Sequence, residues 1–557
     1  MPTSKLRTAL ERLSMHSIES VQDGCTLSAF DTYMHVERPI EQKLRAKMQQ
    51  IEEEGGGIIL LVGSAGDGKS HLISRMKREF AWDSSCYYND ATASCSPRKT
   101  AIDTLKEALA DFRDVSLDTT NRKLVLAINL GKLNAFIDEE YVKSEFQQLV
   151  KATLPIFDED DSTPPIETER IKVVLFTNEQ IFEFYPEDDG KYPVKSFFLS
   201  SLLGKIVARN DENVFYRAYL EDVQNGLDDA DPVRINYELL SLSDVRKTVE
   251  MSVIEAIIRS QLLITPREFL DFVYSILVPP IERKSLTALD CEALLPTLIY
   301  GGGNNMILQA LSELDPLKHS STEHDKQLSI LFNAHAIPEE VFPSAVTEQL
   351  PEIMLHRLNK LYDNNGRDTP RVAKFVYRLK HVLDYHSESV DYLSYLALLR
   401  DVFNNSDVEI ENVYQLVSKA IPRHCGSYCN KYDMIPLSIH GSKYRIFSSL
   451  KLEPKEIKSS FSKEKRTEFF LHFNLVWKSP EVPMPVGLTM NYQLYTYLQD
   501  LNRGKLALDY ESEKNLAFSD FVANLARMCN CEKELFIVRN DGKEMTLKKP
   551  FRSIYFQ

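Results

Sequence analysis

Short apolar runs alternate with amphipathic segments along the first half of the chain. Runs of aliphatic and β-branched residues without polar interruption are typical of strands that are buried on both faces of a parallel sheet. Such runs predict four strands, at 58–62, 86–88, 124–128 and 173–176. Apolar residues at helical spacing predict helices between them, among others at 71–80, 101–110 and 139–154. Strands that alternate with helices predict an α/β fold with a parallel sheet and right-handed crossovers.

Helical periodicity dominates on both sides of this region. Residues 1–50 are predicted to be helical, as are 245–263 and most of the chain to about 421. Thr265-Pro266-Arg267-Glu268 has the sequence of a capping box with proline at the first helical position, so a helix over 265–277 should begin there. Strand-like runs return near the end, at 444–450, 469–477, 488–498 and 535–538, and 540–542 predicts a hairpin turn before 545–547.

Composition and charge narrow the classes of protein that fit these elements. The 557 residues carry 66 Lys and Arg against 81 Asp and Glu, a formal charge of −15, which argues against a protein that coats nucleic acid with its whole surface. Residues 431–557 carry 20 basic and 15 acidic side chains, so this end could contact phosphates or an acidic partner. The eight cysteines fit a reducing cytosol, and no apolar run is long enough for a membrane span or a secretory signal. We therefore expect a cytoplasmic protein with no membrane segment.

One motif carries clear chemistry. It follows the first predicted strand and matches G-x-x-x-x-G-K-[ST]: Gly63-Ser64-Ala65-Gly66-Asp67-Gly68-Lys69-Ser70, with His71 next in the following helix. Glycines let the main chain turn so that several N–H groups and the helix N-terminus face one phosphate. Lys69 can reach the β- and γ-phosphates of ATP, and the Ser70 hydroxyl can bind Mg²⁺. The motif predicts a site for ATP and Mg²⁺; a glycine-rich turn with a surface lysine is the alternative.

Hydrolysis needs a second group, because an acid at the end of a neighbouring strand usually holds Mg²⁺ or activates water. The third predicted strand should supply this acid, but it ends in Asn129. Asp90, after the second strand, is a candidate metal ligand, and Asn178, after the fourth, could sense the γ-phosphate. Glu179 is a weaker candidate for ordering water. Each of these residues could equally be an ordinary polar residue at the end of a strand.

Two arginines are candidates for reporting the nucleotide state. Arg267 lies in the first turn of the helix predicted over 265–277, so it could contact the γ-phosphate from a helical lid and move that lid. A capping or surface arginine is the alternative. Arg217 is a weaker candidate for an arginine that acts across a subunit boundary.

A group of histidine and cysteine residues in the last third of the chain could form a tetrahedral zinc site. The group consists of His424, Cys425, Cys429, Cys529 and Cys531. Their spacings differ from the common C-x2-C, which favours unliganded cysteines.

A basic amphipathic helix is predicted over 370–381. Its basic residues, expected on one side, are Arg371, Lys374, Arg378 and Lys380. This side could bind the DNA backbone or an acidic protein face, and a solvated helix surface is the simpler interpretation.

Five stretches of the chain together resemble the DptF (DndF) ATPase family of DNA-phosphorothioation-dependent restriction systems. They are GSAGDGKSH at 63–71, YNDATA at 88–93, LAINLGKLN at 126–134, the residues 176–178, and TPREFLDFVYSIL at 265–277. The region that they span is about half of the chain. The resemblance implies an AAA-like P-loop ATPase that works with two sister restriction subunits. It also implies a bacterial anti-phage defence system that damages DNA lacking phosphorothioate marks.

The resemblance further implies roles for single residues. The nucleotide cradle would consist of Gly63, Gly68, Lys69 and Ser70. Asn178 would be the sensor after the fourth strand, and Asn129 would stand at the position of the catalytic acid. An asparagine there departs from the general AAA pattern. This departure argues against ATP hydrolysis by the chain without its partners.

These predictions divide the chain into four segments. They are an N-terminal helical segment at 1–50, a P-loop ATPase core at 51–240, a helical lid and helical region at 241–425, and a mixed, strand-rich C-terminal domain at 426–557. The expected function is an ATP-binding and ATP-hydrolysing subunit of a restriction complex. One alternative is a nucleotide-binding scaffold or switch subunit with negligible hydrolysis; a P-loop small-molecule kinase is less favoured. Contact with DNA, directly or through partners, and homo-oligomer formation are also open.

Overall fold

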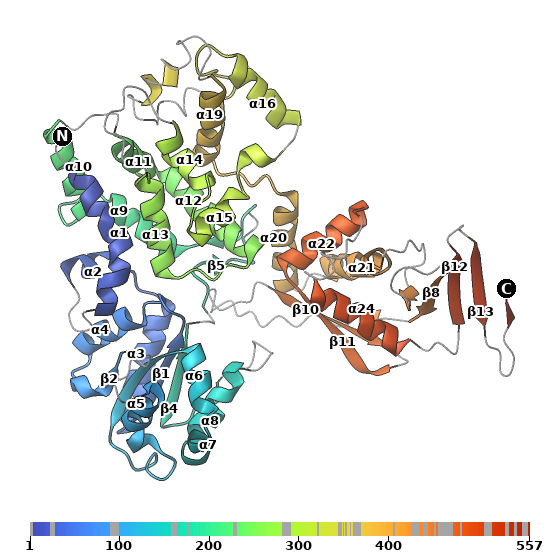
Figure 1. Ribbon diagram of the computed structural model, residues 1–557, viewed down its shortest axis with the longest axis horizontal. Coiled ribbons are helices and arrows are strands. Elements are labelled where there is room, and N and C mark those ends of the chain that lie inside the picture. The colour runs from blue at the N-terminus through green and yellow to red at the C-terminus, as the bar shows by residue number, and fades with distance from the viewer. Residues whose placement is uncertain are drawn as a thin grey trace. The chain divides into compact units, whose positions relative to one another are not determined.

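A computed structural model of the chain places the four predicted strands side by side in one parallel sheet (Figure 1). The strands are β1 (Gly57–Gly63), β2 (Tyr87–Tyr88), β3 (Lys123–Asn129) and β4 (Ile171–Leu175), in the order β2-β3-β1-β4. β1 pairs in parallel with both β3 and β4, so Gly63 lies beside Asn129. The predicted strands and the α/β fold are confirmed.

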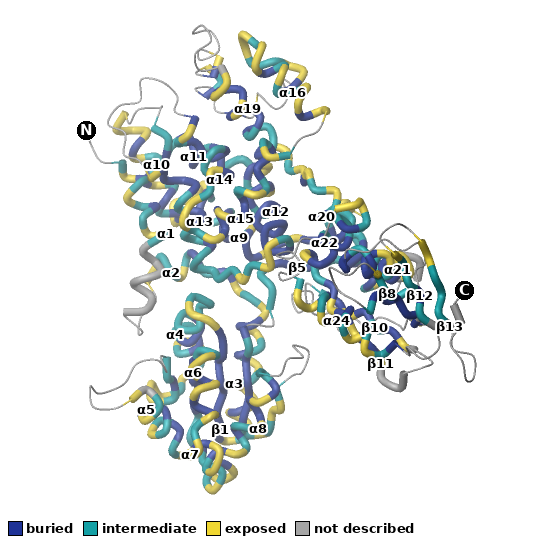
Figure 2. Tube along the Cα trace, turned by 45° about the vertical axis from the view of Figure 1, so that its right-hand side comes forward, coloured by how far each residue is buried: buried dark blue, intermediate teal, exposed yellow. Residues whose placement is uncertain are grey.

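Helices cover both faces of this sheet. On one face, α3 (Pro39–Glu53) and α4 (Lys69–Glu79) pack against Ile59 and Leu61 of β1. The helices on the other face are α5 (Ala101–Ala108), α6 (Leu130–Ile137), α7 (Glu140–Glu145) and α8 (Gln147–Thr153). Every residue of β1 is buried, which Figure 2 shows in dark blue. Burial on both faces explains why this strand is an uninterrupted apolar run.

The single helix predicted over 139–154 is instead the pair α7 and α8. The break falls at the buried Phe146, whose φ of −131° and ψ of 42° are not helical. The Asp114 carboxylate accepts hydrogen bonds from the main-chain N–H groups of Gln147 (2.6 Å) and Gln148 (3.0 Å). This distant side chain gives α8 an N-terminal cap of its own, which local periodicity does not reveal.

A helical layer makes up much of the rest of this part of the molecule (Figure 1). It comprises α1 (Lys5–Gln22), α2 (Ala29–Met34), α9 (Phe197–Val207), α10 (Val214–Gln224), α11 (Pro232–Leu240), α12 (Ser243–Ser260), α13 (Pro266–Leu277), α14 (Leu295–Tyr300), α15 (Met306–Ser312), α16 (Thr322–Asn333) and α19 (Thr369–Leu383). α1 packs against α10 and α13. The buried Asp222 of α10 accepts hydrogen bonds from the main-chain N–H groups of Lys5 (2.8 Å) and Leu6 (2.9 Å). A carboxylate at a helix N-terminus is stabilising, so the N-terminal helix is fixed to this layer.

The chain forms two compact units. The first comprises Met1–Glu183, Lys195–Ile257 and Leu262–Glu388, and the second comprises Phe184–Val194, Ile258–Gln261 and Ser389–Gln557. The structure describes residues 4–22, 28–89, 100–157, 165–176, 179–188, 190–226, 231–280, 291–319, 322–342, 348, 350, 354–356, 358–359, 369–404, 407–425, 434–437, 444–450, 453–454, 472–479, 482–505, 515–529, 534–539, 543–548 and 555–556. The parallel sheet and the helical layer belong to the first unit, apart from residues 258–260 at the end of α12.

The second unit combines helices with antiparallel sheets. Its helices are α20 (Val390–Phe403), α21 (Asp407–His424), α22 (Tyr492–Arg503) and α24 (Leu516–Met528). One sheet has the order β11-β10-β9 and the other the order β14-β13-β12-β8-β7. The strands are β7 (Met434–Pro436), β8 (Tyr444–Ser449), β9 (Glu453–Pro454), β10 (Phe473–Ser479), β11 (Val482–Met490), β12 (Glu534–Arg539), β13 (Glu544–Lys548) and β14 (Tyr555–Phe556). Elsewhere, β5 (Glu183–Phe184) and β6 (Val194–Lys195) form a two-stranded sheet.

The strand predicted over 488–498 is wrong beyond Met490, because a helix begins at Tyr492. The Asn491 side chain accepts a hydrogen bond from the Leu494 N–H (2.8 Å) and caps α22. Tyr492, Tyr495, Leu498 and Leu501 are buried at helical spacing. The predicted turn at 540–542 lies outside the described residues, and the strands on either side of it, β12 and β13, pair antiparallel.

Candidate functional site

The turn between β1 and α4 lies at the carboxyl end of the parallel sheet, where α/β proteins commonly bind ligands. Gly66 and Gly68 adopt φ angles of 89° and 91°, which residues with a side chain rarely adopt. A Cβ atom on Gly63 would lie 2.9 Å from the Cβ of Phe176. The glycines of the motif are therefore needed for the course of the main chain.

Charged groups inside this turn bond to its main chain. The Lys69 ammonium donates to the Ser64 carbonyl, and the Asp67 carboxylate accepts from the Ser64 N–H. Lys69 Nζ and Asp67 Oδ2 are 3.9 Å apart. Burial lowers the pKa of Lys69 and raises the pKa of Asp67. The turn thus holds a partly desolvated lysine. Beside it lies an aspartate whose pKa is raised by burial.

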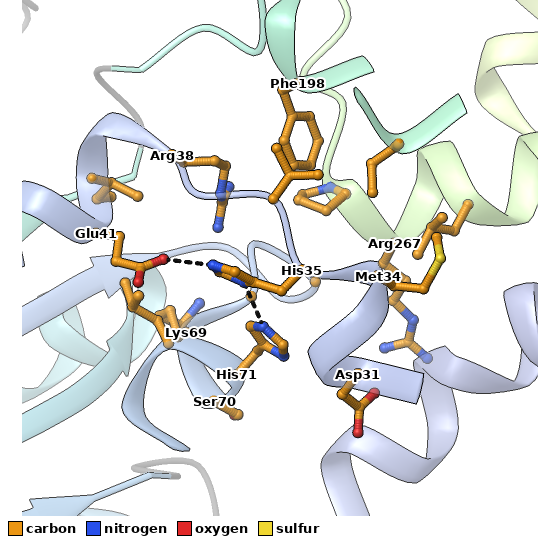
Figure 3. Close-up of a pocket in the computed structure, with 18 of the residues that line it drawn as sticks. Asp31, Met34, His35, Arg38, Glu41, Lys69, Ser70, His71, Phe198 and Arg267 are labelled. Atoms are coloured by element: carbon orange, nitrogen blue, oxygen red, sulfur yellow. Dashed lines mark hydrogen bonds and ion pairs between the residues drawn. The ribbon is translucent and has the colours of Figure 1, made fainter. Parts of the chain in front are cut away.

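A cavity of about 330 Å³ opens beside the turn (Figure 3). Residues from the turn and α4, from the ends of β2 and β3, from the linker between α2 and α3, and from α9 and α13 line it. The residues predicted from the sequence that border it are Ala65, Gly66, Gly68, Lys69, Ser70, His71, Asn129 and Arg267. The structure therefore brings together residues from three separate parts of the sequence.

Two of the predicted polar residues lie outside the described residues, namely Asp90 and Asn178. Asn89, the neighbour of Asp90, borders the cavity. Its side-chain oxygen is buried and has no hydrogen-bond partner among the described residues. Such an oxygen is costly unless a ligand, ion or water satisfies it.

Glu179, predicted to order water, does not border the cavity. Its buried carboxylate forms an ion pair with Lys43 of α3, with 2.8 Å between Oε1 and Nζ. Arg217, the other weak candidate, is exposed on α10 and also lies away from the cavity. Neither residue borders the cavity of its own chain, and a role of Arg217 across a subunit boundary stays a prediction.

Arg267 borders the cavity from the first turn of α13. The predicted capping box is confirmed, because the Thr265 N–H donates to Glu268 Oε2 (2.8 Å) and the Glu268 N–H donates to Thr265 Oγ1 (3.3 Å). A Cβ atom on Gly66 would lie 3.0 Å from Thr265 Oγ1, so the start of α13 lies directly against the turn. Figure 3 shows Arg267 and Asp31 together, across the cavity from Lys69.

Three further residues of this site come from the linker before α3 and from α3 itself, and no sequence motif predicted them. His35 Nδ1 lies 3.0 Å from His71 Nε2, and His35 Nε2 lies 3.1 Å from Glu41 Oε2. Burial alone would raise the pKa of Glu41, but the hydrogen bonds and charges of His35 and Arg75 outweigh it, so the pKa is lowered. The third residue, Arg38, donates from Nη2 to the Asp67 carbonyl (2.7 Å). The only sequence signal for them is their position just before and within a helix predicted to precede the first strand.

The candidate zinc residues lie in the second unit. Nδ1 of the buried His424 lies 2.7 Å from Tyr497 Oη, and its Nε2 lies 3.2 Å from Ser519 Oγ. Burial raises the pKa of Cys425 to about 12, which disfavours the thiolate that metals bind. Cys429 and Cys531 lie outside the described residues, and within the described part no group of three or more His, Cys, Asp or Glu could hold a metal.

The basic residues of α19 do not form one solvated side. Arg371 and Lys374 are exposed. Arg378 Nη2 lies 2.6 Å from Asp315 Oδ2, and Lys380 donates to Gln327 Oε1 (2.8 Å). Arg371 Nε also lies 3.5 Å from Glu292 Oε1. Partners within the chain therefore engage three of the four basic side chains that were predicted to share a surface.

Among the described helices, none has both the length and the apolar character required to cross a membrane. Comparison of the chain with protein-family models, with curated proteins and with solved structures yields no match in any of the three.

Proposed function

We propose that the chain binds ATP with Mg²⁺ in the cavity beside the β1–α4 turn. One observation carries the proposal. A glycine turn with left-handed residues and a partly buried lysine, between a parallel strand and a helix, borders a cavity of about 330 Å³. Cavities of this order bind small molecules. The N–H groups of such a turn and of the helix N-terminus favour a phosphate, and Lys69 supplies the positive charge.

Two groups beside the turn fit a magnesium ion. Ser70 borders the cavity at the start of α4, and the Asn89 side-chain oxygen borders it at the end of β2 with no partner among the described residues. Mg²⁺ prefers oxygen ligands and keeps several water molecules, so a hydroxyl and an amide oxygen suit it. When bound, the ion neutralises charge on the β- and γ-phosphates. Ser70 and Asn89 would hold the ion on the side of the cavity where β2 ends.

Part of the cavity lining is apolar and fits a nucleobase. This lining comes from α2, the linker, α9 and α13, namely Met34, Val36, Leu202, Pro266 and Leu270. Small-molecule sites are mostly apolar and carry a few polar groups that fix orientation. The base would therefore lie between the linker and α13, with the triphosphate extending to Lys69.

We further propose that hydrolysis depends on a group from outside the described residues. Asn129, beside Gly63 at the end of β3, has a neutral amide that can hydrogen-bond but cannot take a proton from water. Asp90 or a partner subunit would supply the base. The same observation favours a second function, a nucleotide-binding switch subunit with negligible hydrolysis of its own.

The resemblance to the DptF (DndF) family supports a place for this nucleotide site in a restriction complex that acts on DNA without phosphorothioate marks. The contact between the turn and the start of α13 offers a route for nucleotide state to reach the helical layer. Sister subunits, or DNA held by them, would then respond to the altered helical surface.

The test is Lys69→Ala, compared with Lys132→Ala, which removes an exposed lysine of α6. Loss of a charge-assisted bond to phosphate should weaken Mg-ATP binding by about 10- to 100-fold in Lys69→Ala, with no change in the control. Calorimetry measures the affinity, and the unfolding temperature checks that both variants fold. If Lys69→Ala bound Mg-ATP with unchanged affinity, the proposal would be wrong. ATP turnover alone, then with copurified partners and with modified or unmodified duplex DNA, separates an ATPase from a switch subunit.

A further inference from the structure

Arg38 is the last residue of the linker between α2 and α3, and its side chain reaches the phosphate turn. Its guanidinium Nη2 donates to the Asp67 carbonyl at 2.7 Å. A Cβ atom on Gly68 would lie 3.1 Å from the same nitrogen, so the guanidinium lies directly against the turn. One side chain therefore joins the linker to the main chain of the turn, 29 residues further along the sequence.

The same guanidinium lies over two aromatic rings. Its central carbon is 5.3 Å from the ring centroid of Phe176 and 5.6 Å from that of Phe198. Phe176 follows β4, and Phe198 lies in the first turn of α9. Figure 3 shows Arg38 and Phe198 on the same side of the cavity. Arg38 thus contacts the sheet, the turn and the helical layer at once.

The surroundings of Arg38 suit a planar cation rather than a surface charge. Burial lowers its pKa, and the carboxylates of Glu179, Asp67 and Glu41 act against this. No carboxylate among the described residues forms an ion pair with it, so a main-chain carbonyl and two ring faces stabilise the charge. A guanidinium can stack and donate in its plane at the same time, whereas an ammonium cannot.

The far end of α9 is tied to the same segment of chain. Tyr33 Oη of α2 donates to the Lys205 carbonyl (2.7 Å), and Lys205 Nζ donates to the Tyr33 carbonyl (2.5 Å). Arg38 contacts the first turn of α9, and Tyr33 contacts its last turn. The segment from Tyr33 to Arg38 therefore holds α9 at both ends.

From these contacts we infer that Arg38 is a positioning residue that couples the phosphate turn to α9. The inference rests on the proposed nucleotide site and deepens it. A phosphate that fixes the Asp67–Gly68 peptide also fixes the guanidinium bonded to its carbonyl, and the stacked ring of Phe198 then orders α9. The surface of the helical layer thereby reports whether the turn is occupied.

Hydrogen exchange of the full chain, with and without Mg²⁺ and a non-hydrolysable ATP analogue, tests this coupling. In the unsubstituted protein, protection should rise about tenfold both in the turn and in α9. In Arg38→Ala the rise in the turn should persist, while the rise in α9 should fall below about twofold. Arg38→Lys should behave like Arg38→Ala, because lysine keeps the charge but cannot stack and donate together.

The matched control is Arg12→Ala, which removes an α1 arginine that lies over the single ring of Phe30, at 5.8 Å. It should behave like the unsubstituted protein. If Arg38→Ala does not fold, Phe198→Leu removes the ring face and keeps apolar volume, and it should also uncouple α9 from the turn. An undiminished response of α9 in the Arg38 or Phe198 variants would overturn the inference and leave the nucleotide site standing. No added protection of the turn in the unsubstituted protein would overturn the nucleotide site, and the coupling with it.

Discussion

The carboxyl ends of β1 and β3 lie side by side, with Gly63 beside Asn129, yet they present different chemistry. β1 continues into a glycine turn with Lys69 and Ser70 at the start of α4. β3 continues into α6, and the Asn129 side chain makes no capping hydrogen bond to that helix. One strand end therefore gathers groups that favour an anion, whereas its neighbour offers a neutral amide.

At the proposed nucleotide site, this difference separates the requirements for binding from those for turnover. Main-chain N–H groups and a lysine suffice to hold a phosphate. Turnover also needs a group that orients or deprotonates water, and an asparagine can do only the former. Changes at the β1 end should alter affinity, and changes at the β3 end should alter rate.

The largest expected effect comes from one methyl group added in the turn after β1, and the same addition beyond β3 is its control. Gly68→Ala places a Cβ at a φ of 91°, 3.1 Å from Arg38 Nη2, so the turn must distort. Strain of about 2–3 kcal/mol would weaken Mg-ATP binding by about 100-fold. Gly131→Ala, in α6 just beyond β3, has nothing within 4 Å of the added atom.

Gly131→Ala should leave affinity unchanged and stabilise the protein by about 0.5–1 kcal/mol, because alanine favours a helix over glycine. Calorimetric titration of both variants measures the affinity for Mg-ATP, and chemical denaturation measures the free energy of unfolding. Equal affinities in Gly68→Ala and Gly131→Ala would contradict the assignment of the β1 end as the anion site.

The next effect is on rate and comes from Asn129→Asp. A carboxylate at the end of β3 could orient and deprotonate water, so ATP turnover should rise by about tenfold if this group limits the rate. Affinity for Mg-ATP should change by less than about threefold, because carboxylate and amide have similar size and the anion-binding groups lie on β1. The measurement is steady-state phosphate release by the full chain. The control is Asn134→Asp, which makes the same change at an exposed position of α6. A rate that stays at the level of the control would show that water activation depends on some other group.

Local sequence patterns sufficed for the sheet because β1 is buried on both faces and its motif is contiguous. They failed where a capping side chain decides where a helix begins. Asp114 caps α8 and splits a predicted helix, and Asn491 begins a helix inside a predicted strand. In both cases a polar side chain caps a helix, and the helix begins at a residue where the apolar pattern predicts that another element continues.

In the candidate site, too, the residues that are close in sequence were predictable and those that meet only in the folded structure were not. Lys69 and Ser70 were predictable because their neighbours in sequence are their neighbours in space. Arg38 and His35 were not, because their contacts with Asp67 and His71 form only when α3 packs on the sheet. Nothing in the spacing of these residues indicates that the linker before α3 returns to the turn.

The smallest expected effect concerns the acid within the β1 turn. The Asp67 carboxylate accepts the Ser64 N–H and lies 3.9 Å from Lys69, so it competes with a phosphate for both groups. Asp67→Asn should therefore tighten Mg-ATP binding by about three- to tenfold at pH 8. Burial raises the pKa of Asp67, and a bound polyphosphate would raise it further, so binding takes up a proton. The affinity of the unsubstituted protein for Mg-ATP should therefore rise as the pH falls from 8.

Titrations of both proteins from pH 8 to pH 5 give the ratio of their affinities, in which protonation of ATP itself cancels. The ratio should move toward one as the pH falls, because burial raises the pKa of Asp67 and protonation removes the charge that competes with phosphate. A ratio that does not change with pH would show that the carboxylate does not compete with phosphate. Weaker binding by Asp67→Asn throughout would assign Asp67 the opposite role, in which its bond to Ser64 holds the β1 turn in its binding conformation.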